Sequence, residues 1–267
     1  MPQDELQPEL VRNRHGSGAF RRRLRMTAPD DTTVVVGIED DMHHYEAALF
    51  HDGTRITGVR AAGPRMPWEP CSGALDQLRH LVGCPLTGTA SRLFAWTDVR
   101  QQCTHLYDAA VLGVLHAARG KTGTRQYDAT VPDWNQPPFD AWIERDGVEV
   151  LRWRMAARLE IESPEPFSGR AIKGGFVRWC EQVLDVEEAE AAWVLQRTVW
   201  LSSARLVDLE DCDNAIVSGL TPNVCWTSQP ERYPIAYRRR GTLRDHGPSA
   251  DRMLTDMPSR WPQLHGT

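Results

Sequence analysis

The sequence lacks any run that approaches the roughly 20 apolar residues of a membrane span. The first residues, Met1-Pro2-Gln3-Asp4-Glu5, contain neither the basic nor the apolar region of a secretory signal peptide. The net charge of −5 gives no general attraction to nucleic acid or to an anionic membrane. We therefore expect a cytoplasmic protein with neither nucleic acid nor membrane among its partners.

Several motifs of common enzyme classes are also missing. There is no Gly-x-Gly-x-x-Gly, Walker loop, Gly-x-Ser-x-Gly or His-Glu-x-x-His pattern, so nucleotide cofactors and α/β-hydrolase chemistry are not expected. The six cysteines contain no Cys-x-x-Cys pair, which excludes a zinc ribbon or thioredoxin motif. In the cytoplasm these thiols would stay reduced.

The 267 residues are enough to bury a substantial core. Two Asp-Gly pairs, Asp52-Gly53 and Asp146-Gly147, each lie between β-prone segments and predict hairpins, because both turn positions favour positive φ. Apolar residues at helical spacing predict helices elsewhere. The expected strands are 33–38, 45–51, 54–60, 126–131, 139–145 and 148–155, and the expected helices are 72–82, 104–118, 176–183 and 186–204. The class is α+β, with antiparallel hairpins and helices packed on one face.

The composition along the chain suggests four parts. These are a flexible N-terminus (1–20), a first half (21–122) with the candidate site, a second half (123–245), and a loose C-terminal tail (246–267). The basic run 21–25 is interpreted as a solvated entry segment, as a partner for acidic surface, or as an anion contact.

The most informative stretch is 102–108, where Cys103 and His105 stand at the start of an apolar helix. Both residue types are strong ligands for a borderline metal, and both are candidate nucleophiles or bases. Residues two apart on a helix point about 200° apart, so the two side chains converge only if Cys103 precedes the helix. A thiol at that position is expected to have a lowered pKa.

A second cluster, residues 39–44, supplies the candidate partners. His43 and His44 are adjacent in a predicted strand and should point to opposite faces, so only one is expected to face Cys103. Glu39 and Asp40 are candidates to orient a ligand or to move protons. Cys71, in a turn before a predicted helix, resembles Cys103 in position. The predicted metal ligands are His43, His44, Cys71, Cys103 and His105, and the predicted catalytic residues are Glu39, Asp40, His44 and His105.

Three further residues are candidates for substrate binding. Most of the ten tryptophans must be core, but Trp68 lies in a proline-rich crossing and can wall an aromatic pocket. Tyr107 belongs to the same stretch as His105. Arg232 follows Pro230-Glu231 and either holds a substrate carboxylate or forms a structural pair.

In combination, several of these stretches resemble the bacterial domain-of-unknown-function family 2889. The stretches are 21–25, 39–44, 71–74, 102–108, 169–170, 175–179 and 229–232. The family name implies no activity. More weakly, residues 33–118 are similar in order to NifU-type iron–sulfur scaffolds, in which Cys71 and Cys103 would match the two helix-start cysteines. The scaffold's early strand cysteine is missing here, and only Asp40, His43 or His44 stands near that position, which argues against cluster assembly.

The leading hypothesis is a hydrolase or lyase that acts on a small aromatic or hydrophobic catabolic intermediate. Its site would hold zinc, with iron as the alternative, and the open position on the metal would polarise substrate or activate water. In a metal-free version, His44 or His105 is the base and Asp40 or Asp108 orients it. A metal or iron–sulfur carrier and a purely structural protein are the other hypotheses. The sequence is compatible with a homo-oligomer.

Overall fold

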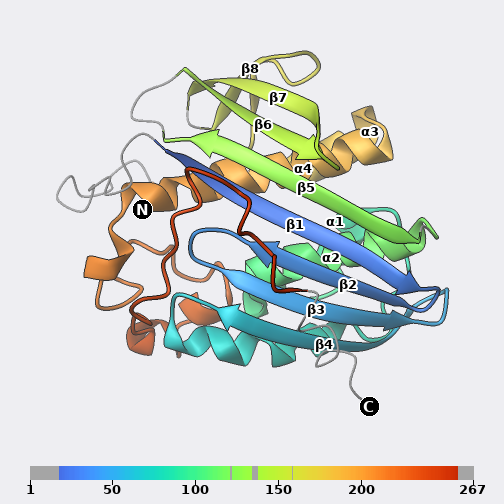
Figure 1. Cartoon of the computed structure of the whole chain (residues 1–267), viewed down its shortest axis with the longest axis horizontal. Coiled ribbons are helices and arrows are strands. Elements are labelled where there is room, and N and C mark those ends of the chain that lie inside the picture. Colours follow the sequence, from blue (N-terminus) through green and yellow to red (C-terminus); the bar gives the residue numbers. More distant parts are fainter. Residues whose placement is uncertain (1–17, 121, 134–137, 158, 258–267) are drawn as a thin grey trace.

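The computed structural model describes residues 18–120, 122–133, 138–157 and 159–257, and within them nine strands form one antiparallel sheet. The sheet order is β4-β3-β2-β1-β5-β6-β7-β8-β9 (Figure 1). The strands are β1 (Ala19–Asp30), β2 (Thr33–Glu39), β3 (His44–His51), β4 (Ile56–Arg65), β5 (Gly123–Pro132), β6 (Phe139–Arg145), β7 (Val148–Ala157), β8 (Glu160–Ser163) and β9 (Arg170–Ala171). The predicted α+β class is confirmed.

The basic run belongs to β1, a strand in the middle of the sheet that the sequence analysis does not predict. Phe20, Leu24 and Met26 are buried on one face, and the arginines at 21, 23 and 25 alternate with them. This period-two pattern is typical of a strand, and it was obscured by the density of arginine. β1 pairs with β2 on one side and with β5 on the other, so the two predicted halves of the chain share one sheet.

Both predicted hairpins are present, but their turns differ. At the β6–β7 turn Asp146 and Gly147 both have positive φ, as expected for this pair. At the β3–β4 turn only Gly53 does. There the Asp52 carboxylate accepts hydrogen bonds from the backbone N–H groups of Thr54 and Arg55, which fixes the turn through a side chain instead.

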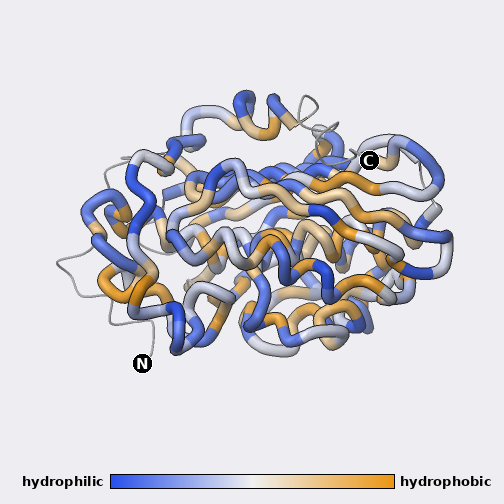
Figure 2. Tube along the Cα trace, turned by 90° about the horizontal axis from the view of Figure 1, so that it is seen from below, coloured by the Kyte–Doolittle hydropathy of each residue, from blue (hydrophilic) through white to orange (hydrophobic). Residues whose placement is uncertain are grey.

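The helices form a second layer on one side of the sheet (Figures 1 and 2). α2 (Thr104–Ala118) packs on β1–β3, and α4 (Val186–Ser202) packs on β5–β7. The Asp185 carboxylate caps α4 by accepting a hydrogen bond from Glu188 N–H. The shorter helices are α1 (Ala90–Phe94) and α3 (Phe176–Val183). The segment predicted as a helix over 72–82 instead forms two 3-10 helices, Glu69–Ala74 and Asp76–Leu81. No described helix has the length and apolar character needed to cross a membrane.

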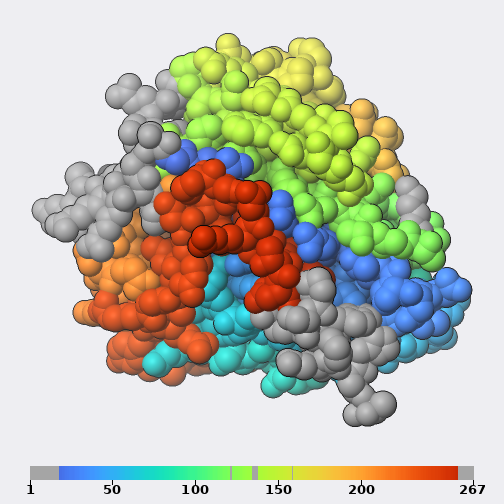
Figure 3. Space-filling model, in the orientation of Figure 1, coloured from blue at the N-terminus to red at the C-terminus, as the bar shows by residue number. Residues whose placement is uncertain are grey.

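The opposite face of the sheet carries the C-terminal segment 244–257, which we call the strap (Figure 3). The sequence analysis predicts a loose tail from residue 246, but the described part of that tail is packed. Met253, Leu254 and Met257 are buried, and Leu254 and Met257 pack with Val35 and Ala48 of the sheet. The apolar side chains of the strap therefore cover apolar sheet residues that the helices do not reach. Residues 1–17 and 258–267 lie outside the described residues. Of the predicted flexible stretch 1–20, Ala19 and Phe20 belong to β1 and are buried.

Candidate functional site

The site is built on the tight loop between β2 and β3. Asp40 is fully buried there. Its Oδ1 accepts hydrogen bonds from the backbone N–H groups of Met42 at 2.9 Å and His43 at 2.8 Å. The backbone N–H of Asp40 in turn donates to the carbonyl of His43. These bonds fix the carboxylate and leave its second oxygen, Oδ2, pointing away from the loop backbone.

Two histidines converge on this carboxylate. His43 Nδ1 lies 3.0 Å from Asp40 Oδ1. His105, in the first turn of α2, stacks on the His43 ring with centroids 3.6 Å apart. His105 Nε2 lies 3.8 Å from Asp40 Oδ2, and neither atom has a hydrogen-bond partner among the described residues. We call these three residues the Asp40 cluster; their ligand atoms lie within 4.8 Å of one another.

The electrostatics of the cluster follow from its burial and its charges. Burial favours the neutral form of Asp40, but the charge and hydrogen bond of His43, with the charges of His105 and Arg22, hold its pKa well below the usual range. The His105 pKa is lowered well below its usual value, first by burial and then by the His43 charge. The cluster therefore combines an ionised carboxylate with a neutral imidazole near neutral pH.

Two arginines stand behind the cluster, around Asp108. Asp108 follows His105 by one helical turn, and its carboxylate lies 3.2 Å from Arg22 Nη2 and 3.5 Å from Arg197 Nε. Arg22 comes from β1 and Arg197 from α4, so three elements meet here. The sequence analysis missed the role of both arginines. The sequence does contain a signal for Arg22: in the alternating pattern of β1 it stands on the apolar side, between Phe20 and Leu24, which indicates a buried arginine.

The cysteines do not join the histidines. Cys103 is the N-cap of α2, as predicted. The prediction of a lowered thiol pKa is wrong, because burial raises the pKa of Cys103 to about 12 and that of Cys71 to about 11. Cys71 Sγ lies 3.2 Å from Thr227 Oγ1. Among the described residues, neither cysteine belongs to a convergent group of three ligands.

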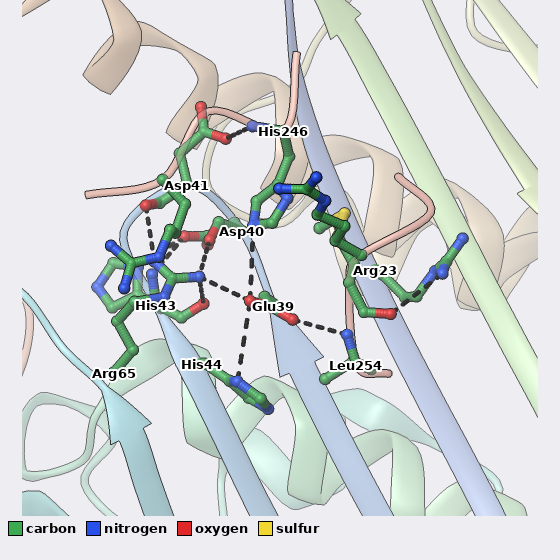
Figure 4. Close-up of polar contacts among 12 residues, drawn as sticks. Arg23, Glu39, Asp40, Asp41, His43, His44, Arg65, His246 and Leu254 are labelled. Atoms are coloured by element: carbon green, nitrogen blue, oxygen red, sulfur yellow. Dashed lines mark hydrogen bonds and ion pairs between the residues drawn. The ribbon is translucent and has the colours of Figure 1, made fainter. Parts of the chain in front are cut away.

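His44 lies on the strap side of the sheet, so the predicted opposite orientation of the two adjacent histidines is confirmed. Its Nε2 is 2.8 Å from Glu46 Oε1. Its Nδ1 is 3.8 Å from Glu39 Oε1 (Figure 4). His44, Glu46 and Asp256 form a second group of converging ligand atoms. Glu39 also contacts Arg65, His246 and the backbone N–H of Leu254. Glu39 and His44 are thus separated by the sheet from His105.

The three predicted substrate-binding residues make structural contacts. The Tyr107 hydroxyl donates to the carbonyl of Leu93 at 2.5 Å in the core. Trp68 is buried, and the guanidinium of Arg238 lies over its ring. Arg232 donates to the carbonyl of Trp226 and stacks on that ring at 3.6 Å, which corresponds to the structural pairing considered for it.

Comparison with known proteins finds one family model that matches the part of the chain containing the cluster. The model of the family described as "Protein of unknown function (DUF2889)" matches residues 11–118. The match includes the whole Asp40 cluster with Arg22 and Asp108, while the resembling stretches after residue 118 lie outside it. A search of curated proteins finds no match, and no finding supports the similarity to iron–sulfur scaffolds. Over residues 11–118, the chain is similar to the DUF2889 family.

Proposed function

We propose that the protein is a hydrolase or lyase that holds a divalent metal ion with Asp40, His43 and His105. The observation that carries this proposal is the pair of buried, unpartnered atoms Asp40 Oδ2 and His105 Nε2, which face each other at 3.8 Å. A buried polar atom without a partner is costly, so two of them side by side indicate a missing ligand. Metal bonds of about 2.0–2.2 Å to N and O place two donors on one ion roughly 3–4 Å apart.

The donor set suits a catalytic metal. Two imidazoles and one carboxylate are typical of catalytic zinc and of non-haem iron sites that keep coordination positions open. When bound, such an ion polarises a carbonyl or lowers the pKa of a bound water. The side chains of His43 and His105 are each about 10% exposed, so part of each histidine reaches the surface. The backbone N–H groups on Asp40 Oδ1 would hold the carboxylate in place.

The Asp40 cluster replaces the mixed cysteine–histidine site as the proposed metal centre. Cys71 and Cys103 are left out of the ligand set because, among the described residues, neither thiol belongs to a group of converging ligand atoms. The free state of all six cysteines supports the proposed cytoplasmic location. We keep a small aromatic or hydrophobic catabolic intermediate as the proposed substrate, although Trp68 and Tyr107 do not bind it in this proposal.

Elemental mass spectrometry on untagged protein tests the ligand assignment. After incubation with Zn²⁺ and removal of excess ion, we expect about one zinc per chain. Asp40→Asn and His105→Ala should each reduce this content at least about tenfold, because a site with three protein ligands loses one of them. His80→Ala removes an exposed histidine and should leave the content unchanged. Wild-type protein that binds neither Zn²⁺ nor Fe²⁺, or retention of metal by both cluster variants, contradicts the proposal.

A metal-free site is the second candidate, favoured by the 3.0 Å contact between His43 Nδ1 and Asp40 Oδ1. In that arrangement Asp40 orients His43, which acts as a general base in an elimination or retro-aldol step. The two candidates differ in one measurement. Once a substrate is found, removal of divalent ions by a chelator abolishes turnover in a metal enzyme and leaves an acid–base enzyme active.

A further inference from the structure

Arg197, a basic residue beside the Asp40 cluster, has an ion-pair partner but no hydrogen bond at Nε. Among the described residues, Arg197 pairs with Asp108 at 3.5 Å through Nε, without the geometry of a hydrogen bond, and lies 5.6 Å from the centre of the Phe94 ring. Its side chain is 36% exposed, whereas those of Arg22 and Asp108 are 1% and 5% exposed. Arg197 Nε is thus buried beside Asp108, while the side chain as a whole is partly exposed.

The charges around the cluster suggest what kind of ligand Arg197 can bind. The carboxylates of Asp40 and Asp108 are balanced by the guanidiniums of Arg22 and Arg197. A divalent ion on the cluster adds two positive charges that no described side chain in this group compensates. An anionic ligand would restore the balance, and a carboxylate can accept two parallel hydrogen bonds from an arginine fork.

The neighbouring side chain suggests what the anion is attached to. Phe94, at the end of α1, is partly buried and packs edge-on against Trp193. It lies beside Arg197, so the guanidinium is close both to an apolar ring and to the Asp108 carboxylate. An apolar or aromatic body attached to a carboxylate would pack on Phe94 while the carboxylate meets the arginine.

We propose that the substrate of the Asp40 cluster carries a carboxylate and that Arg197 binds it, with Phe94 contacting the adjacent apolar part. This inference rests on the proposed metal-dependent function, because it takes the metal as the origin of the excess positive charge. It assigns Arg197 a role in specificity, at a position outside the matched family region.

Benzoate is a suitable probe, because it combines a carboxylate with an aromatic ring. We would titrate it into zinc-loaded protein by isothermal calorimetry, using the wild type and the Arg197→Gln, Arg197→Lys and Arg79→Gln variants. Arg79 is exposed and lies outside this group, so it serves as the matched control. The expected result is a dissociation constant raised about tenfold or more by Arg197→Gln, less by Arg197→Lys because the charge remains, and not by Arg79→Gln.

Zinc content and circular dichroism of each variant separate the two proposals. Wild-type zinc content retained in Arg197→Gln, together with weaker benzoate binding, supports the inference. Equal benzoate affinity in the wild type and Arg197→Gln, or no benzoate binding by the zinc-loaded wild type, overturns it and leaves the metal site intact. Failure of the wild type to bind zinc overturns the proposed function instead.

Discussion

Adjacent residues in the β2–β3 loop serve opposite faces of the sheet. Asp40 turns towards α2 and the two stacked histidines. Asp41 turns towards the strap, where its carboxylate pairs with Arg205 at 2.7 Å and accepts a hydrogen bond from the backbone N–H of His246. Burial raises the pKa of Asp41, whereas the pKa of Asp40 is held low by its positive neighbours. One short loop therefore connects the candidate site to the strap.

The buried thiol of Cys71 should give the protein a measurable alkaline sensitivity. Its pKa is about 11 in the folded state, against about 8.5 for an unperturbed cysteine. Because the pKa is higher in the folded state, the folded protein favours the protonated thiol. The contribution of this thiol to the unfolding free energy is complete below pH 8.5 and is lost as pH rises through 11. In that window, we expect Cys71 to contribute a loss of about 1.4 kcal/mol in unfolding free energy per pH unit.

Urea unfolding of the wild type and of Cys71→Ala at pH 8.5, 9.5 and 10.5 measures this contribution. The variant should start less stable, because it leaves a cavity, but its unfolding free energy should fall less steeply with pH. Ser72→Ala, which removes a side chain that does not titrate in this range, should keep the steep wild-type slope. Parallel slopes for the wild type and Cys71→Ala would show that the thiol ionises as easily in the folded protein as in the unfolded chain.

At the scale of single residues, the sequence identified the types of residue in the site better than their environments. Asp40, His43 and His105 were all among the candidates, because their spacing at a strand end and a helix start predicted convergence. The thiol pKa of Cys103 could not be predicted, because the effect of a helix N-terminus is overcome by burial, which depends on the whole fold. Arg197 was missed because nothing in its local sequence connects α4 to α2.

Among the elements, α2 is the one that positions the site, and a glycine sets its distance from the sheet. Gly113 lies in the middle of this helix, where glycine costs about 1 kcal/mol relative to alanine. A Cβ at this position would lie 2.6 Å from both Leu49 Cδ1 and Val36 Cγ1. Glycine therefore permits a close approach of α2 to β2 and β3 that no other residue allows.

Gly113→Ala should lower the unfolding free energy by about 1–3 kcal/mol, since overpacking outweighs the gain in helix propensity. Because α2 also carries His105, the variant should bind zinc more weakly than the wild type. Urea unfolding and zinc titration measure the two effects. Gly174→Ala is the control, since a Cβ there meets no atom within 4 Å. A Gly113→Ala protein as stable as the wild type would mean that α2 can move away from the sheet at no cost.

The hairpins and the two long helices were predictable because their signals are local. Asp-Gly turns, an acidic N-cap and apolar periodicity each act over a few residues. The prediction of an α-helix over 72–82 was wrong because its apolar spacing suits an α-helix, yet Pro70 just before it and Gly73 within it favour short, tight turns. β1 was not predicted because its place in the sheet depends on a distant partner. It lies between β2 and β5, and β5 is about 100 residues away in sequence.

At the scale of the whole molecule, one sheet separates two differently covered faces. The helices cover the face that bears the Asp40 cluster, and the strap crosses the other face (Figures 1 and 3). Three arginines of β1 donate hydrogen bonds to backbone carbonyls of the strap. Arg21 donates to Gly247, Arg23 to Met253 and Arg25 to Leu254. The basic run is thus a row of donors for one segment of the same chain.

Leu254 should contribute most to the packing of the strap on the sheet. It is fully buried, and its side chain contacts the position where a Cβ of Gly37 would lie, so a glycine at 37 makes room for it. Its backbone N–H donates to Glu39 at 2.6 Å. Leu254→Ala removes most of the apolar contact, and a buried Leu→Ala change costs about 2–5 kcal/mol where the surroundings cannot collapse.

Because the strap packs in a small cluster apart from the main core, we expect this cost to appear as local opening of the strap. Hydrogen exchange followed by mass spectrometry should show at least about tenfold faster exchange in residues 244–257 of Leu254→Ala, with α2 unchanged. Thr255→Ala alters an exposed neighbour and should exchange like the wild type. Equally faster exchange in α2 would mean that strap and core unfold as one unit, and the β2–β3 loop would then transmit loss of the strap directly to Asp40.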